Sequence, residues 1–206
     1  MLETIGELER YLGLREGFFH QLQTEDDWSL VIKLNSLIET SCSAMLSEAL
    51  CKPELMDAFS QVQTGTEKAG KLAFISSLKL LSRDEIRYIE ALAWLRNRLV
   101  HNVGSTQRNI VEHLALLKPE RRAELEKSLN LSESIVFKDV KYSGREVVSS
   151  FPQQAIWMSA MACLHSICIQ IVFGQKRKQL LDTHVFELKK NGPIVLECED
   201  LKLVPR

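Results

Sequence analysis

The stretch from Ser82 to Gly104 constrains the fold more than any other part of the sequence, because its local chemistry specifies a helix at both ends. Ser82 can cap the free backbone N–H groups, and Glu85, three residues later, can reach back to it, which is the pattern of a capping box. Gly104 follows the last apolar residue of the helical pattern and suits the left-handed turn that closes a helix. We therefore predict one helix over most of this stretch.

One face of this predicted helix is apolar. At about 100° per residue, six residues fall on a single stripe: Ile89, Leu92, Ala93, Leu99, Val100 and Val103. Arg96 falls in the middle of this stripe, where a charge is costly unless it is paired or reaches water or a ligand. Asn97 and His101 are four residues apart, so they lie together on one edge of the stripe. An arginine beside this pair indicates a functional site.

The other apolar patterns also predict helices, so the expected fold class is mainly all-α, an antiparallel helical bundle. The predicted helices cover residues 3–23, 26–50, 67–80, 107–117, 120–129 and 152–173. The last of these is apolar nearly all round, but Gln154, His165 and Gln170 interrupt it. We therefore predict a buried core helix and no membrane span.

Two segments depart from this helical pattern. Residues 132–149 alternate weakly between apolar and polar side chains, so we expect an irregular excursion with a short strand. Asn191-Gly192 separates two strand-like runs, which predicts a small β-hairpin over residues 184–202. The expected organisation is a helical domain over 1–183 followed by this hairpin. Residues 203–206 match part of a thrombin cleavage sequence, and we expect a remnant of an expression tag.

Composition bounds the class of function. The chain has 206 residues and a net charge of −1, so any binding of nucleic acid would rest on a local patch. Five cysteines without metal-ligand spacing predict reduced thiols and neither a metal nor a cofactor: Cys42, Cys51, Cys163, Cys168 and Cys198. The first ten residues lack a secretion signal, which favours a cytoplasmic location.

Arg96, Asn97 and His101 together have the functional groups that cleave RNA without a metal. Such cleavage needs a base for the 2′-hydroxyl proton, an acid for the leaving oxygen and a cation on the phosphate. Histidine titrates in the appropriate range, and arginine offers a planar fork of donors for phosphate oxygens. Each copy supplies one histidine in this cluster. The chemistry therefore predicts a symmetric homodimer in which the central helices face each other.

Residues 96–101, with the sequence RNRLVH, resemble the R-N-x-x-x-H motif of HEPN domains, which are all-helical bundles. Many proteins with this motif are metal-independent endoribonucleases of toxin–antitoxin, phage-defence or RNA-processing systems, and they generally act as dimers. The resemblance implies that Arg96 and His101 are catalytic and that Asn97 is a supporting polar residue. It further implies an RNA substrate and an antitoxin or regulatory partner.

The resemblance extends to residues 65–102 and 152–167, which are similar to segments of mannitol operon repressor-like proteins. Some proteins of that group have a decayed motif and a regulatory role through protein contacts, which gives an alternative function as a non-catalytic regulator or scaffold. In that alternative, His101 caps its helix and Arg96 reaches a carboxylate. The carboxylates considered for Arg96 are Glu39, Glu48 and Glu90. Residues 132–149 and the expected hairpin match neither family.

Overall fold

A computed structural model describes residues 5–101, 109–132, 134–137 and 140–190. This part of the chain is mostly helical, which confirms the prediction of an all-α fold. The elements in chain order are α1 (Ile5–Tyr11), α2 (Phe18–Leu22), α3 (Asp27–Ala49), the single turn η1 (Pro53–Leu55), α4 (Met56–Gln61), α5 (Lys71–Ser77), α6 (Arg83–Val100), α7 (Ile110–Ala115), α8 (Pro119–Ser128), β1 (Ser134–Phe137), β2 (Val140–Ser143), α9 (Gly144–Ser150) and α10 (Pro152–Lys190). The expected antiparallel arrangement does not hold for the central pair of helices, because α3 and α10 run in the same direction: the Gln153 side chain donates a hydrogen bond to the Glu25 carbonyl at their starts, and Gly174 lies against Glu48 further on.

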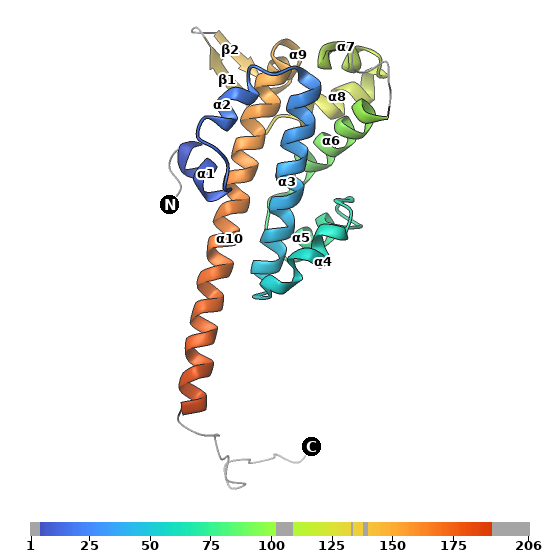
Figure 1. Ribbon diagram of the computed structural model, residues 1–206. Helices are drawn as coiled ribbons and strands as arrows, with labels where there is room; N and C mark the ends of the chain where they lie inside the picture. The colour runs from blue at the N-terminus through green and yellow to red at the C-terminus, as the bar shows by residue number, and fades with distance from the viewer. Residues whose placement is uncertain (1–4, 102–108, 133, 138–139, 191–206) are drawn as a thin grey trace, which may run out of the picture.

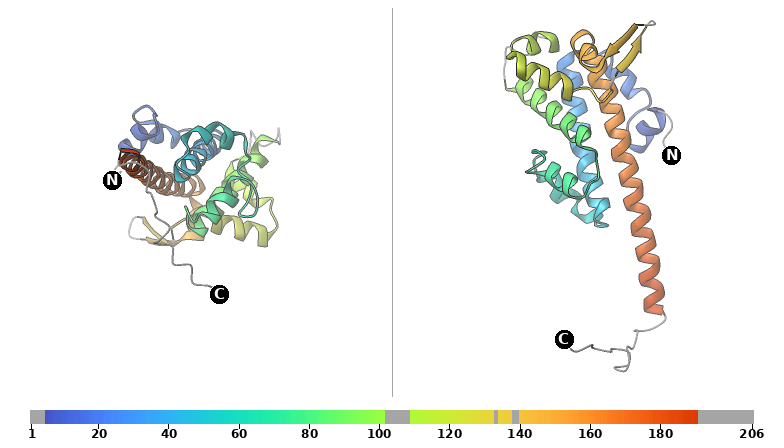
Figure 2. Two further views of the ribbon diagram at one scale, coloured as in Figure 1. Left: turned by 90° about the horizontal axis from the view of Figure 1, so that it is seen from below. Right: turned by 180° about the vertical axis from the view of Figure 1, so that it is seen from behind.

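Helices α3 and α10 lie side by side and form the centre of the molecule (Figures 1 and 2). Their facing side chains are buried: Leu30, Val31, Leu34, Ile38, Cys42, Met45 and Leu46 from α3, and Ala155, Ile156, Ala160, Cys163, Leu164, Ile167 and Cys168 from α10. Helix α10 is long and apolar enough to cross a membrane by length and composition, and half of its apolar window is buried inside the fold. A core helix meets the same criteria, and the burial explains why this segment is apolar on most sides.

Single residues have defined roles at the two ends of α3, where it packs against α10. The Asp26 side chain accepts a hydrogen bond of 2.9 Å from the Ser29 N–H and so caps α3. Near the other end of α3, Gly174 of α10 lies against Glu48. A Cβ atom at Gly174 would be 2.6 Å from the backbone carbon and oxygen of Glu48, so only glycine fits there.

Helix α10 continues well beyond the bundle (Figure 1). Residues 184–190, predicted as the first strand of a hairpin, are the last residues of this helix, so that prediction is wrong. Between Gly174 and Asn191 the sequence has no Gly or Pro, and nothing in it stops a helix. The expected domain boundary after residue 183 therefore falls inside α10. Residues 191–202 of the expected hairpin, and 203–206, lie outside the described residues.

The N-terminal segment forms two short helices rather than the single helix predicted for residues 3–23. Gly13 and Gly17 have φ values of 68° and 77°, in the left-handed region that interrupts a helix. The buried carboxylate of Glu9 accepts hydrogen bonds of 2.8 Å from the N–H groups of Gly17 and Phe19. These bonds fix the turn and place α2 against α10, where the Trp157 indole donates to the Phe19 carbonyl at 2.9 Å.

Residues 134–137 and 140–143 form a two-stranded antiparallel ribbon, β1–β2, which agrees with the short strand expected in this segment. Ser143 then caps α9 through a capping box with Glu146. The Leu131 N–H donates a hydrogen bond of 3.0 Å to the hydroxyl of Ser159 on α10. The ribbon and α9 thereby sit at the end of the molecule where α10 begins (Figure 1).

Helix α6 begins as predicted. The Ser82 N–H donates to the Glu85 carboxylate at 2.7 Å, and the Glu85 N–H donates to the Ser82 hydroxyl at 3.3 Å, which completes the capping box. In the middle of the fold, the buried Tyr88 hydroxyl donates a hydrogen bond of 2.8 Å to the Ile156 carbonyl of α10. This bond anchors α6 to the core, and its last turn carries the predicted site residues.

Candidate functional site

The predicted site residues lie at the C-terminal end of α6. Arg96 and Asn97 belong to the last turn of the helix, which ends at Val100. His101 is the C-cap residue, and its N–H donates a hydrogen bond of 3.1 Å to the Asn97 carbonyl. The structure thus brings all three residues to one exposed helix end, with Asn97 and His101 exposed and Arg96 half-buried.

The buried face of α6 is centred between Leu92 and Leu95 rather than on Arg96. Its buried residues are Ile86, Tyr88, Ile89, Ala91, Leu92, Leu95 and Leu99. Val100, expected on the apolar stripe, is 40 % exposed, so the stripe predicted from the sequence is shifted. At about 100° per residue, Arg96 falls on the edge of the buried face, and Asn97 and His101 fall on the opposite, solvent side.

Arg96 keeps hydrogen-bonding capacity free at this edge. Its Nη1 donates a hydrogen bond of 2.9 Å to the Asn97 side-chain oxygen. Its Nε is buried, and among the described residues it has no hydrogen-bond partner. Because a buried donor without a partner is costly, this arginine is a candidate to bind an anion.

The carboxylate partners considered for Arg96 are engaged elsewhere or form no ion pair with it among the described residues. Glu39 lies 3.7 Å from the buried ammonium of Lys71 and accepts a hydrogen bond from the Thr64 hydroxyl. Glu90 accepts a hydrogen bond of 2.6 Å from the Glu67 N–H. Glu48 contributes no ion pair in the described part of the chain. Among the described residues, none of these three carboxylates therefore forms the ion pair with Arg96 that this alternative requires.

Trp94 is flanked by two arginines and does not offer a free ring face for a nucleobase. The guanidinium carbons of Arg98 and Arg121 lie 5.5 and 5.3 Å from its ring centroid. This cation–π arrangement joins α6 to α8 next to the motif. Arg121 carried no signal in the sequence, because nothing in its local pattern predicts that α8 crosses α6 at Trp94.

A hollow beside α6 lies towards the N-terminal half of the helix, away from the motif. It has a volume of about 1020 Å³ and lies between α6, α8 and the start of α9. Several of its charged groups are already paired, Arg87 with Asp84 at 3.2 Å and Arg121 with Glu124 at 2.6 Å. None of the three motif residues lines it. The candidate site is therefore an exposed surface and not this hollow.

In the described part of the chain, no group of three or more His, Cys, Asp or Glu side chains is arranged to hold a metal ion. The chain matches no family model, no curated protein and no solved structure. The site and the motif are therefore the basis for any functional assignment.

Proposed function

We propose that this chain is a metal-independent endoribonuclease of HEPN type that acts as a homodimer, as a toxin or a phage-defence component in the cytoplasm. The observation that supports the proposal most is the placement of Arg96, Asn97 and His101 together at the exposed end of α6. The motif is intact, its arginine has an unpartnered Nε among the described residues, and its histidine faces solvent.

Each residue has a distinct role in the proposed reaction. The RNA 2′-hydroxyl gives its proton to a base, its oxygen attacks the adjacent phosphorus, and the 5′-oxygen leaves with a proton from an acid. His101 transfers protons, and Arg96 stabilises the charge that develops on the phosphate oxygens. Asn97 holds the Arg96 guanidinium through the 2.9 Å hydrogen bond between their side chains.

A dimer through α6 supplies the second histidine. In a two-fold interface the same surface of each copy is used, so a motif at an exposed helix end can face its own copy. Val100, which is 40 % exposed in the same turn, offers an apolar contact for this interface. One dimer would then hold two Arg96 and two His101 side chains in one cleft.

The test is cleavage of single-stranded RNA by purified protein in the presence of EDTA. We expect cleavage by the wild type and a loss of at least about 100-fold in Arg96→Ala and in His101→Ala. Arg83→Ala, at the exposed start of the same helix, and His20→Ala, on exposed α2, are matched controls that keep full activity. Thermal melting monitors the fold of every variant. Intact RNA with folded wild-type protein over a broad substrate panel would refute the proposal.

A second candidate is a regulator or scaffold related to mannitol operon repressor-like proteins. It is favoured by apolar side chains exposed around the motif end of the molecule, where Val111 of α7 and the C-cap residue Leu116 are 42 % and 58 % exposed. Such a surface suits an antitoxin or another protein partner. A pull-down in which Leu116→Glu loses a partner, while Arg96→Ala keeps it and no RNA is cut, would favour this candidate.

A further inference from the structure

The second half of α10 is an exposed helix that the rest of the fold does not cover. After Gly174, every described side chain of α10 up to Phe186 is exposed except Lys178. We call residues 175–190 the arm. At 1.5 Å per residue the arm is about 24 Å long. An isolated helix of this length is only marginally stable in water, so a partner for the arm would stabilise it.

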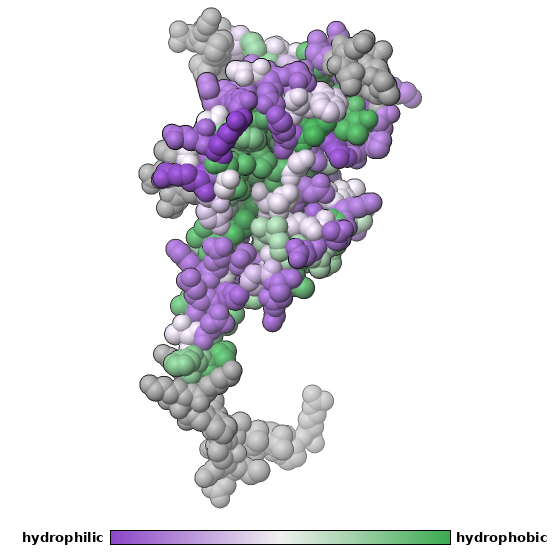
Figure 3. All heavy atoms as spheres, viewed as in Figure 1, coloured by the Kyte–Doolittle hydropathy of each residue, from purple (hydrophilic) through white to green (hydrophobic). Residues whose placement is uncertain are grey.

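The arm carries large apolar side chains that face solvent. The exposed fractions are 73 % for Leu180, 50 % for Leu181, 47 % for Val185 and 67 % for Phe186, and Phe173 just before the arm is 58 % exposed. Apolar spheres are visible at the lower end of α10 in Figure 3. Such a cluster at the end of a projecting helix marks an interaction surface.

Most of these side chains share one side of the helix. Phe173 and Leu180 are seven residues apart, and Leu181 and Val185 are four apart. At about 100° per residue these four fall within a sector of about 140°, wide enough for a helix–helix contact. Phe186 lies outside this sector. A helical partner of the same length would bury the sector along the whole arm.

The distribution of apolar groups along the arm is nearly symmetric about Leu180. Within the sector, Phe173 lies seven residues before this position and Val185 five residues after it, with the Leu180–Leu181 pair at the centre. A two-fold interface requires a surface that is complementary to itself. Two arms that run antiparallel and cross at Leu180 place the apolar residues at one end against those at the other.

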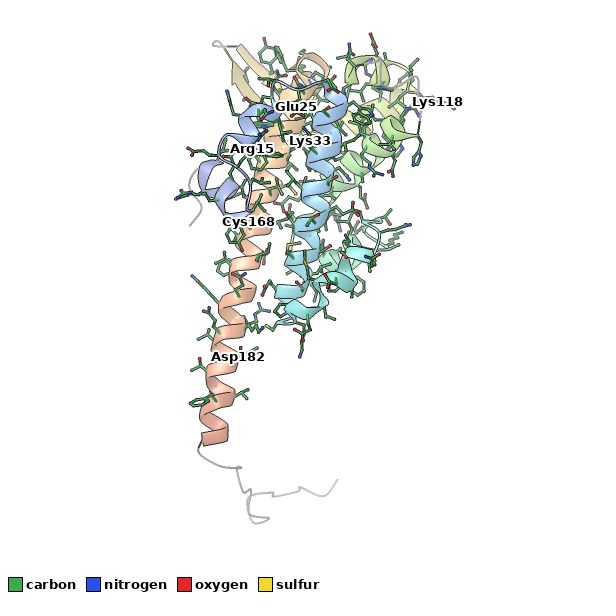
Figure 4. The ribbon with its side chains drawn as sticks, viewed as in Figure 1. Arg15, Glu25, Lys33, Lys118, Cys168 and Asp182 are labelled. Atoms are coloured by element: carbon green, nitrogen blue, oxygen red, sulfur yellow. The ribbon has the colours of Figure 1, made fainter. Side chains whose placement is uncertain are left out.

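Charge favours the same arrangement. Lys176, Arg177 and Lys178 give the first part of the arm three positive charges, and the rest of the arm has the charged residues Asp182, Glu187, Lys189 and Lys190. Asp182 lies on the free part of α10, away from the bundle (Figure 4). Parallel arms would place the three cations of each copy beside one another, which is repulsive. Antiparallel arms that cross at Leu180 place Lys178 opposite the partner's Asp182.

We propose that the arm is a docking site for a second copy of this chain, in an antiparallel helix pair with its two-fold axis near Leu180. This contact is separate from the dimer through α6 and does not depend on ribonuclease activity. It joins two bundles at the ends opposite to the motif, so both motifs stay exposed.

Cysteine cross-linking tests the arm pairing without relying on the oligomeric state, which the α6 interface also affects. The background is the full chain with Cys51→Ser and Cys198→Ser, because Cys42, Cys163 and Cys168 are buried or mostly buried. In this background we expect Leu180→Cys to form a disulfide-linked dimer under mild oxidation. Val185→Cys, which lies in the same sector, should not cross-link, because antiparallel arms hold its two copies about 15 Å apart along the axis.

A second pair of variants controls for changes at the interface itself. Adding Leu181→Glu to the Leu180→Cys chain should abolish the cross-link, and adding Gln154→Glu, at an exposed position of α10 within the bundle, should leave it unchanged. Mixing Phe173→Cys and Val185→Cys chains should give a cross-linked heterodimer, because both positions lie in the apolar sector and face each other across the axis at Leu180.

Three outcomes would overturn the proposal. Equal cross-linking at positions 180 and 185 would mean parallel arms. Absence of a cross-link at 180 and in the mixed sample, at high protein concentration, would mean that the arms do not meet. Sedimentation of the uncross-linked chain with phosphatidylglycerol-containing vesicles, lost in Leu181→Glu, would mean that the arm binds a lipid surface instead.

Discussion

At the scale of single residues, burial determines how the core thiols behave. Burial raises the pKa of the Cys42 thiol to about 12 and that of Cys168 to about 11, from an ordinary value of 9.0. In the folded protein these thiols keep their protons at pH values where the unfolded chain loses them. Their contribution to stability is therefore fully present below pH 9.0 and is lost as the pH rises through the folded values.

We therefore expect the free energy of unfolding to fall above pH 9.0, by about 1.4 kcal/mol per pH unit for each thiol. Urea unfolding under reducing conditions, at a series of alkaline pH values, measures this slope. Cys42→Ala removes one of the thiols and should lower the slope accordingly, even if its stability at neutral pH is reduced. A stability that stays constant up to pH values near 11 would contradict this expectation.

The position of the candidate site residues in the fold was predictable from the sequence, but their exact setting was not. The sequence placed Arg96, Asn97 and His101 at one helix end, and the structure has them there. The helical wheel centred the apolar stripe on Arg96, because it gave weight to Val100 and to Val103, which lies outside the described residues. Burial is instead decided by which neighbours α6 meets, and Tyr88 and Leu95 face the core. Tertiary contacts of this kind are not encoded in local periodicity.

At the scale of elements, Gly174 controls how closely α10 approaches α3. A change from Gly to Ala inside a helix ordinarily stabilises it by about 1 kcal/mol. At Gly174 the added Cβ would lie 2.6 Å from the Glu48 backbone, so the two helices must separate. We expect Gly174→Ala to lower the free energy of unfolding by about 1–3 kcal/mol. Urea unfolding measures the change.

Gly6 provides the matched control for this substitution. It is also a helical glycine, in α1, and a Cβ atom there meets nothing within 4 Å. Gly6→Ala should therefore be neutral or slightly stabilising. If Gly174→Ala were as stable as the wild type, the close α3–α10 contact would be wrong.

Helix starts were more predictable than helix ends. Ser82 and Asp26 cap α6 and α3 where the sequence indicated, because a cap is a local pattern of a few residues. The prediction of a C-terminal hairpin was wrong for residues 184–190 for a related reason. Asn191-Gly192 is a strong turn signal, but residues 184–190 before it form helix that continues from the core. A helix already nucleated by packing extends at little cost, and this overrides a weak strand pattern.

At the scale of the whole molecule, α10 joins two regions of different stability. Its first part is buried against α3 and fixed by bonds to α2 and α6, from Trp157 to Phe19 and from Tyr88 to Ile156. Its second part, the arm, makes almost no contact with the bundle. The apolar composition of the first part predicted a core helix that ends at residue 173, which is close to where burial along α10 ends, but the sequence did not predict that the helix continues beyond it.

Hydrogen exchange should separate these two regions within one continuous helix. Exchange reports local opening, so amides from Gln154 to Ile171 should be protected close to the limit of global unfolding, and those of the arm should exchange much faster at low protein concentration. Because a second copy would cover the arm, raising the concentration should slow exchange there and leave the buried part unchanged. Leu181→Glu should remove this concentration dependence. Uniform protection along α10 at all concentrations would mean that the helix opens as one unit and that the bundle itself stabilises the arm.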